Sequence, residues 1–353
     1  MTLGADVSNI SADGPAAASH GLSIVVPLYN EAAGLGALHQ RLNALAERLR
    51  HEFGLACEVV YVNDGSADET LQIARQLPAI SLDVQVVSLS RNFGKEAALM
   101  AGLDNSRRSS AVLFMDGDGQ HSPDLAATLV GHWVRDGYDV VYTAKAHRRN
   151  ESTLMRFAVH GFYALINWRA RHRIPEDAGD FRLLSPRAAV ALRQMPERNR
   201  FFKGLASWIG FRQIRVDYEP EPRAHGHTSF SPGKLIGLSI DGLTSFSVAP
   251  LRFASLLGLL LAFTAFLFGL SILWETLVDG KSVPGYPSLM VGVMVLGGMQ
   301  LIMIGIVGEY IGKILSEMKG RPIYFVAEKM SRTAGQESNA AAIEGNPSRT
   351  AAE

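Results

Sequence analysis

The sequence predicts an α/β domain with a mainly parallel sheet, followed by two membrane-spanning helices. Up to about residue 230, apolar strand-like runs alternate with helical segments, which is the pattern of strands joined by helical crossovers. Several strands are continuously apolar, as expected for strands buried on both faces. Two long uncharged segments then follow, and each has the roughly 20 residues that a helix needs to cross a hydrocarbon core.

Composition limits the classes of function. The 353 residues include 34 Lys and Arg against 34 Asp and Glu, so no overall positive charge favours nucleic-acid binding, and we expect no nucleic-acid partner. The only cysteine is Cys57, which excludes an intramolecular disulfide and a cysteine-rich zinc site. Residues 1–20 lack the basic run and apolar block of a secretory signal peptide, so we expect the α/β domain to stay in the cytoplasm.

Five strand-like segments form the expected sheet, and helical patterns separate them. They are LSIVVPLYN (22–30), EVVYVND (58–64), VQVVSLS (84–90), AVLFMDGD (111–118) and DVVYTA (139–144). Ligands bind at the carboxyl ends of strands in such sheets, and the polar motifs of this chain fall there.

Two carboxylates follow the fourth strand. Asp116 and Asp118 flank Gly117, so the two acids have little bulk between them. An acidic surface loop is one interpretation. Because these acids directly follow an apolar strand, we favour a site at which a divalent cation joins carboxylate and diphosphate oxygens.

The first three strands also end in polar residues. The first ends in the run Pro27–Glu31, and Asp64 follows the second. Asp64 belongs either to a turn and helix N-cap or to the contacts of a nucleotide base or ribose. Lys95 opens a helix after the third strand, where it either meets an anionic ligand or lies in a solvated loop.

Later segments add charged candidates. A basic amphipathic helix is predicted around residues 154–166, and it either lies on an anionic membrane surface or packs against the sheet. Asp180 lies in an acid- and glycine-containing segment that reads as a turn or as part of the reacting centre. Arg223 lies in an exposed loop or offsets the charge of a diphosphate.

The two uncharged segments run from Phe253 to Trp274 and from Ser282 to Gly308. Buried core helices are the alternative, but such helices seldom avoid charge for so long. Basic residues flank the outer ends, including Arg252 and Lys313, so the positive-inside bias places both chain ends in the cytoplasm and the connecting loop outside. The predicted divisions are a disordered N-terminus (1–20), the α/β domain (21–230), a juxtamembrane amphipathic segment (231–250), the hairpin (251–312, helices at about 253–274 and 284–308), a cytoplasmic segment (313–328) and a disordered tail (329–353).

Six motifs in order, followed by two spans, resemble the polyprenyl-phosphate glycosyltransferases of glycosyltransferase family 2. The motifs are VVPLYNE, VNDGSAD, SRNFGKEAAL, MDGDGQH, GDFRL and RAHGHTSF, and the resemblance covers roughly residues 20–328. It implies a GT-A, Rossmann-like domain at the cytoplasmic (inner) membrane. It also implies an inverting, metal-dependent enzyme that uses Mg²⁺ or Mn²⁺ to move a hexose from a nucleotide diphosphate sugar to polyprenyl (undecaprenyl) phosphate.

Motifs and resemblance together assign candidate roles. Predicted nucleotide-sugar contacts are Pro27, Tyr29, Asn30, Glu31, Asp64, Lys95, Asp116, Gly117 and Arg223; predicted metal ligands are Asp116, Asp118 and Gln120; predicted catalytic residues are Asp180 and Asp118; and predicted acceptor-phosphate contacts are Arg148, Arg156 and Thr228. Asn63 and Ser229 depart from the residues frequent in the family, which bears on donor binding. A phosphate acceptor is already ionised, so Asp180 need only orient it.

The resemblance to bacterial glucosyltransferases makes UDP-glucose the expected donor, with GDP-mannose, UDP-N-acetylhexosamine and UDP-aminoarabinose as alternatives. A processive polysaccharide synthase is disfavoured because the chain has no Gln-x-x-Arg-Trp motif and few spans. An inactive membrane scaffold is disfavoured because Asp116, Asp118 and Arg223 are intact. Relatives also imply a homo-oligomer, with a tetramer as one candidate.

Overall fold

The computed structural model describes residues 21–107, 109–118, 122–145, 178–195, 202–219, 249–278 and 285–335. The strands in these ranges are β1 (Leu22–Leu28), β2 (Cys57–Asn63), β3 (Asp83–Leu89), β4 (Ala111–Phe114), β5 (Val140–Lys145), β6 (Ala178–Leu184), β7 (Gln213–Tyr218) and β8 (Val326–Arg332). The helices are α1 (Ala32–Phe53), α2 (Thr70–Gln76), α3 (Lys95–Asn105), α4 (Pro123–Val134), α6 (Pro186–Arg193), α7 (Phe202–Trp208), α9 (Ala249–Leu277) and α10 (Tyr286–Met318).

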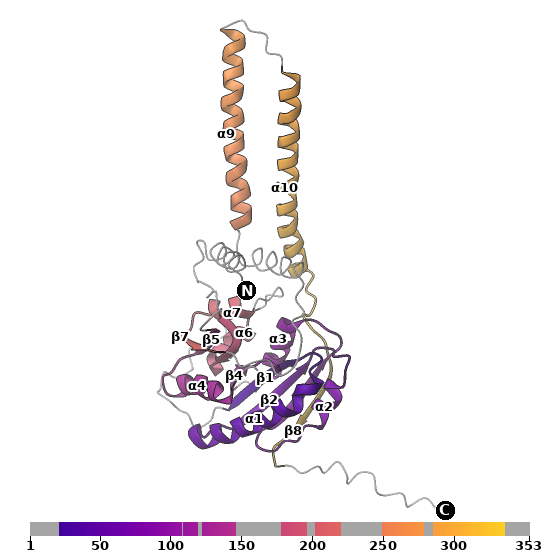
Figure 1. The fold of residues 1–353 in the computed structure, drawn as a ribbon, viewed down its shortest axis with the longest axis vertical. Helices are drawn as coiled ribbons and strands as arrows, with labels where there is room; N and C mark the ends of the chain where they lie inside the picture. The colour runs from indigo at the N-terminus through magenta and orange to yellow at the C-terminus, as the bar shows by residue number, and fades with distance from the viewer. Residues whose placement is uncertain are drawn as a thin grey trace, which may run out of the picture.

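One sheet organises the α/β domain, with strand order β7-β5-β6-β4-β1-β2-β3-β8. The pairs β1/β2, β1/β4, β2/β3 and β5/β7 are parallel, whereas β6 runs antiparallel to both neighbours and β8 antiparallel to β3. The predicted mainly parallel α/β fold is therefore confirmed. Separate apolar clusters cover the two faces, one with α1, α2 and α4 and the other with α3, α6 and α7 (Figure 1).

The fourth strand is shorter than its apolar run predicted. Pairing with β1 and β6 stops at Phe114, and only a single bond from the Met115 N–H to the Val25 carbonyl extends it. The next residues turn out of the sheet. Because β4 ends at Phe114, Asp116 and Asp118 lie beyond the strand and not within it.

The segment around Asp180 is a strand, so the turn interpretation is wrong. Phe181 and Leu183 alternate toward one apolar cluster, and β6 pairs on both sides with β4 and β5. The acids and the glycine masked this period-2 pattern in the sequence. As a result, Asp180 sits within a sheet strand beside β4.

The prediction of a disordered tail from residue 329 is wrong at its start, because β8 continues to Arg332 and pairs with β3. Most of its side chains are exposed, so the segment lacks the apolar pattern that marks a strand. Its partner lies about 240 positions earlier in the chain, which no local pattern reveals. Residues 1–20 and 336–353, also predicted to be disordered, lie outside the described residues.

The two apolar helices are long enough to cross a membrane. Windows at Leu251–Ile272 and Val291–Met318 have mean hydropathies of 2.3 and 2.1, and only 6% and 0% of them is buried. Large apolar side chains exposed along both helices exclude the core-helix alternative. The helices run side by side away from the α/β domain, and α10 continues past the predicted end of its span at 308 (Figure 1). The amphipathic segments predicted at 154–166 and 231–250 lie outside the described residues, except that α9 begins at Ala249.

Candidate functional site

A cavity of about 320 Å³ opens at the carboxyl ends of the central strands. Four parallel-sheet strands and the start of α3 supply its wall, which is the position expected for ligands in such sheets. The lining residues are Pro27, Leu28, Tyr29, Glu31, Asp64, Asn92, Gly94, Lys95, Ala98, Asp116, Gly117 and Asp118. Seven of the predicted nucleotide-sugar residues are thus brought together, and Leu28, Asn92, Gly94 and Ala98 were missed although all four stand in quoted motifs.

A tight turn delivers the two acids. A Cβ added at Gly117 would lie 3.2 Å from both the Leu28 side chain and the Pro27 carbonyl oxygen. Glycine therefore lets the turn pack against the end of β1. Asp116 and Asp118, on either side, both line the cavity.

Lys95 joins the predicted metal and catalytic acids. Its ammonium nitrogen lies 2.6 Å from Asp116 Oδ1 and 2.6 Å from Asp180 Oδ2. Burial on its own would lower the pKa of Lys95, but the two carboxylates outweigh it and raise that pKa above its ordinary value. A cation therefore joins the segment after β4 to β6, and Asp180 lies close to Asp116, one of the acids predicted to bind the metal.

Asp64 holds the loop between β3 and α3. The side chain is buried, and its two oxygens accept hydrogen bonds from the Phe93 N–H at 2.7 Å and the Gly94 N–H at 2.9 Å. Burial raises the pKa of Asp64, and these two bonds oppose the rise without cancelling it. The N-cap interpretation is wrong, because both N–H groups that donate to Asp64 belong to the loop between β3 and α3 and not to α2.

The loops after β2 and β3 pack closely. Gly65 has a φ of +66°, and a Cβ there would lie 2.5 Å from the Asn92 backbone nitrogen. Only glycine fits this approach without a shift of the backbone. The position of the Asp64 carboxylate is therefore set by contacts on both sides.

Asn30 does not line the cavity. It takes a left-handed backbone with φ 57°, its N–H donates to Ser66 Oγ, and its Oδ1 accepts from the Ala67 N–H. The side chain thus ties the end of β1 to the loop after β2. Tyr29, next to it, lines the cavity and is 50% exposed.

Tyr218, which the sequence analysis did not single out, is affected by the charges of the site although it does not line the cavity. It ends β7, where Ile214, Val216 and Tyr218 alternate with polar residues, and this period-2 pattern is the signal that was overlooked. Burial, followed by the charges of Asp116, Asp118 and Asp180, raises the pKa of Tyr218 to about 12. Its hydroxyl therefore stays protonated at neutral pH and can donate a hydrogen bond.

The donor set suits a hard divalent cation. Asp116 and Asp118 supply carboxylate oxygens, and a diphosphate would supply more, which is the ligand chemistry that Mg²⁺ and Mn²⁺ prefer. Within the described residues, no group of three or more His, Cys, Asp or Glu stands close enough to bind a metal by itself. The other predicted residues, Gln120, Arg148, Arg156, Arg223 and Thr228, lie outside the described ranges.

Comparisons with known proteins agree with the division of the chain into an α/β domain and a pair of apolar helices. Residues 23–192 match the sequence model of glycosyl transferase family 2, and residues 249–314 match that of the GtrB C-terminal hairpin. An uncharacterised glycosyltransferase of Synechocystis is 40% identical, over 87% of this chain and 95% of that protein. The prophage bactoprenol glucosyl transferase homolog of Escherichia coli is 38% identical, over 86% and 98%, and the bactoprenol glucosyl transferase of Shigella phage SfV is 38% identical, over 88% and 99%.

Solved structures share less sequence. Mannosyl-3-phosphoglycerate synthase from Rubrobacter xylanophilus is 18% identical, with a TM-score of 0.44 over 68% of this chain and 75% of that one. Glucosyl-3-phosphoglycerate synthase from Mycobacterium tuberculosis, crystallised with Mn²⁺ and UDP, is 18% identical, with a TM-score of 0.42 over 65% and 80%.

Proposed function

Because the chain belongs to glycosyltransferase family 2, as its six motifs predicted, we propose that its cavity binds a nucleotide diphosphate sugar and that the enzyme transfers the sugar to a polyprenyl phosphate. The observation that carries this proposal is the pair Asp116 and Asp118 lining a cavity at the strand ends, in a chain that continues into two unburied apolar helices. The cavity suits a soluble donor, and the helices suit a lipid acceptor.

The chemistry needs placement more than proton transfer. Asp116 and Asp118 would hold Mg²⁺ or Mn²⁺, which when bound neutralises the leaving diphosphate. Lys95 fixes Asp116 and Asp180 relative to each other through its two ion pairs. An acceptor phosphate is already an anion at neutral pH, so Asp180 orients the attack on the sugar and need not remove a proton.

The acceptor side of the proposal draws on the hairpin and on the relatives. Two of those relatives are named bactoprenol glucosyl transferases, which supports a polyprenyl phosphate acceptor and glucose as the sugar. Basic residues such as Arg252 and Lys313 flank the hairpin, which supports a catalytic domain and both termini in the cytoplasm. Arg148, Arg156 and Thr228 at the acceptor, Arg223 at the donor and Gln120 at the metal remain proposals from the sequence, as does a homo-oligomer.

A donor panel tests the function directly. Membranes containing the protein are given undecaprenyl phosphate and radiolabelled UDP-glucose, UDP-N-acetylglucosamine or GDP-mannose, and the products are extracted into organic solvent. We expect label in the organic phase with UDP-glucose, loss of that label with EDTA, and recovery with excess Mn²⁺ or Mg²⁺. Omission of undecaprenyl phosphate is the control. Label found only on a water-soluble acceptor, or turnover unaffected by EDTA, would contradict the proposal.

A further inference from the structure

We propose that the segment leaving the second membrane helix, Tyr324 and Phe325, is a positioning element of the donor cavity. The inference rests on the proposed function, because it takes the cavity as the nucleotide site. It assigns to this short segment the task of holding the loop after β3, residues 90–94, in the shape that receives the nucleotide.

The segment contacts that loop through backbone and side chain. The Ser90 N–H donates a hydrogen bond to the Phe325 carbonyl oxygen at 2.9 Å. The rings of Phe93 and Phe325 lie 6.4 Å apart at 52°, within the range of favourable aromatic pairs. The Tyr324 hydroxyl donates to Asp104 Oδ2 at 2.7 Å, so the same segment also holds α3.

The loop that is held is the one that builds the cavity wall. Asn92 and Gly94 line the cavity, and Lys95 begins α3 directly after them. The N–H groups of Phe93 and Gly94 are the donors to Asp64. A shift of the Phe93 ring would therefore move the Phe93 and Gly94 N–H groups, and with them Asp64 and Lys95. Phe325 itself does not line the cavity.

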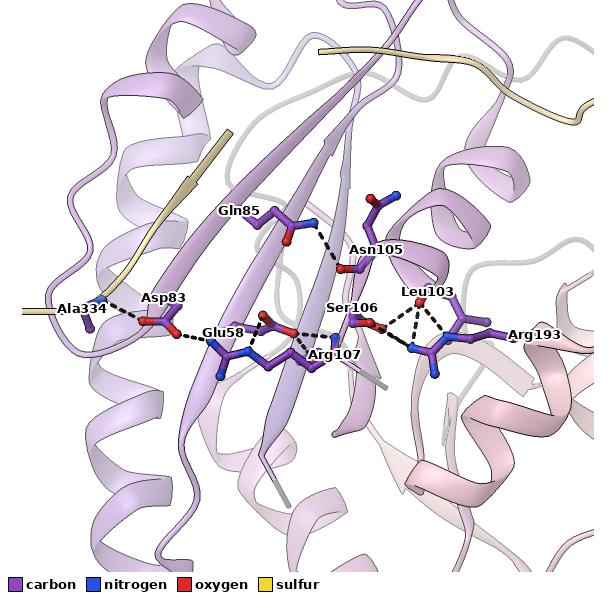
Figure 2. Close-up of polar contacts among 10 residues, drawn as sticks. Glu58, Asp83, Gln85, Leu103, Asn105, Ser106, Arg107, Arg193 and Ala334 are labelled. Carbon is purple, nitrogen blue, oxygen red and sulfur yellow. Dashed lines mark hydrogen bonds and ion pairs between the residues drawn. The ribbon is translucent and has the colours of Figure 1, made fainter. Parts of the chain in front are cut away.

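The strand that follows Phe325, β8, is also held at its far end, beside the amino ends of the parallel strands (Figure 2). The Ala334 N–H donates to Asp83 Oδ1 at 2.7 Å, and the other oxygen of Asp83 pairs with Arg107. Arg107 Nε also lies 3.1 Å from Glu58, a buried acid that accepts a hydrogen bond from the Ser23 hydroxyl. β8 is thus a strap held at both ends, and the contacts at its far end are separate from those that Tyr324 and Phe325 make with loop 90–94.

A purely structural role for β8 makes a different prediction. An edge strand that only covers β3 would stabilise the domain equally from either end and would leave nucleotide affinity unchanged. Phe325 is 56% exposed, so removing its ring should cost little stability. Affinity and stability can therefore be separated by comparing variants at the two ends of the strap.

The test uses the full-length protein in detergent, with UDP and GDP as probes in the presence of Mn²⁺. Phe325→Ala is expected to weaken binding of whichever nucleotide the wild type binds by about tenfold, to raise KM for the nucleotide sugar more than it lowers kcat, and to leave Tm nearly unchanged. Phe325→Tyr keeps the ring and should restore the affinity. Tyr324→Phe, which removes one oxygen atom, should weaken binding by about threefold, and it serves as the second variant if Phe325→Ala fails to fold.

The matched control is Asp83→Ala, which releases the far end of the strap. It is expected to lower Tm and leave the nucleotide Kd unchanged. Unchanged Kd values in folded Phe325→Ala and Tyr324→Phe, or an equal loss of affinity in Asp83→Ala, would overturn the inference and leave the proposed function intact. A wild-type protein that binds neither UDP nor GDP would overturn both.

Discussion

Clusters of charged residues lie at both ends of the parallel strands, at the carboxyl ends (the carboxyl edge) and at the amino ends (the amino edge), and the two clusters have different roles. At the carboxyl edge, Lys95 joins Asp116 and Asp180 beside a cavity. At the amino edge, Arg107 joins Glu58 and Asp83, and the acids also accept backbone N–H bonds (Figure 2). Arg107, Glu58 and Asp83 do not line the cavity described above, whereas Lys95 and Asp116 do. Of these two charge clusters, the one at the carboxyl edge is therefore the one placed to meet a ligand in that cavity.

The neighbourhood of the amino edge shows what such charges do when they are structural. The guanidinium of Arg193 donates to the carbonyl oxygens of Leu103 and Ser106 at the end of α3. Leu103 is among the last four residues of α3, whose carbonyls have no i+4 partner within the helix, and Ser106 is its C-cap. Polar side chains there complete the backbone, whereas at the carboxyl edge Gly117 and Gly65 bring the backbone close and keep the acids at the cavity.

The largest expected effect comes from the carboxyl edge. Asp118→Ala removes a carboxylate from the proposed cation site, and transfer activity should fall by about a thousandfold, because metal-assisted charge neutralisation contributes several kcal/mol. Sugar transfer to undecaprenyl phosphate and Tm are the measurements. Asp124→Ala, at an exposed acid on α4, is the matched control and should keep full activity. Full activity in Asp118→Ala would remove the metal assignment.

Lys95→Met tests the cation between the two acids. Without the ammonium, Asp116 and Asp180 are no longer held together, and we expect kcat to fall by about a hundredfold with a smaller change in KM. Arg48→Met is a close control, since Arg48 also pairs with two carboxylates, but on the exposed face of α1. An equal loss in both variants would show that the effect is one of charge or stability.

At the amino edge the loss should appear in stability and not in activity. Glu58→Ala leaves Arg107 and the buried Ser23 hydroxyl without their shared acceptor, which should lower the free energy of unfolding by about 2 kcal/mol. Denaturant unfolding measures this change, and kcat per folded molecule should stay at the wild-type value. A variant that folds as well as wild type but transfers no sugar would reverse the distinction drawn between the two edges.

The sequence predicted the fold and much of the site for a clear physical reason. Continuously apolar strands such as β1 and β2 are set by local composition, and in a parallel sheet their polar ends must meet at one edge. Asp116, Asp118 and Asp64 could therefore be placed together before their distances were known.

What could not be predicted depends on pairing between distant segments. β6 inserts between β4 and β5, and β8 returns after the membrane helices to pair with β3. The acids and glycine of β6 mask its period-2 pattern, and β8 has no apolar pattern of its own. The two bonds of Lys95 and the loop-holding role of Asp64 follow from those pairings and from the approach of neighbouring loops, so the sequence could name these residues but not their partners.

The smallest expected effect concerns Tyr218, which ends β7 and whose pKa the charges of Asp116, Asp118 and Asp180 help to raise. Tyr218→Phe should lower kcat by about fivefold through loss of one hydrogen-bond donor, with Tyr138→Phe, on the other side of the domain, as the unaffected control. The pKa of Tyr218 is raised from 10.0 to about 12, so unfolded Tyr218 ionises first and wild-type stability should fall as the pH rises through that interval. The fall should be smaller in Tyr218→Phe. Equal pH dependence of unfolding in the two proteins would mean that these charges do not act on Tyr218. The charge cluster at the carboxyl edge would then consist of Lys95, Asp116 and Asp180 without Tyr218.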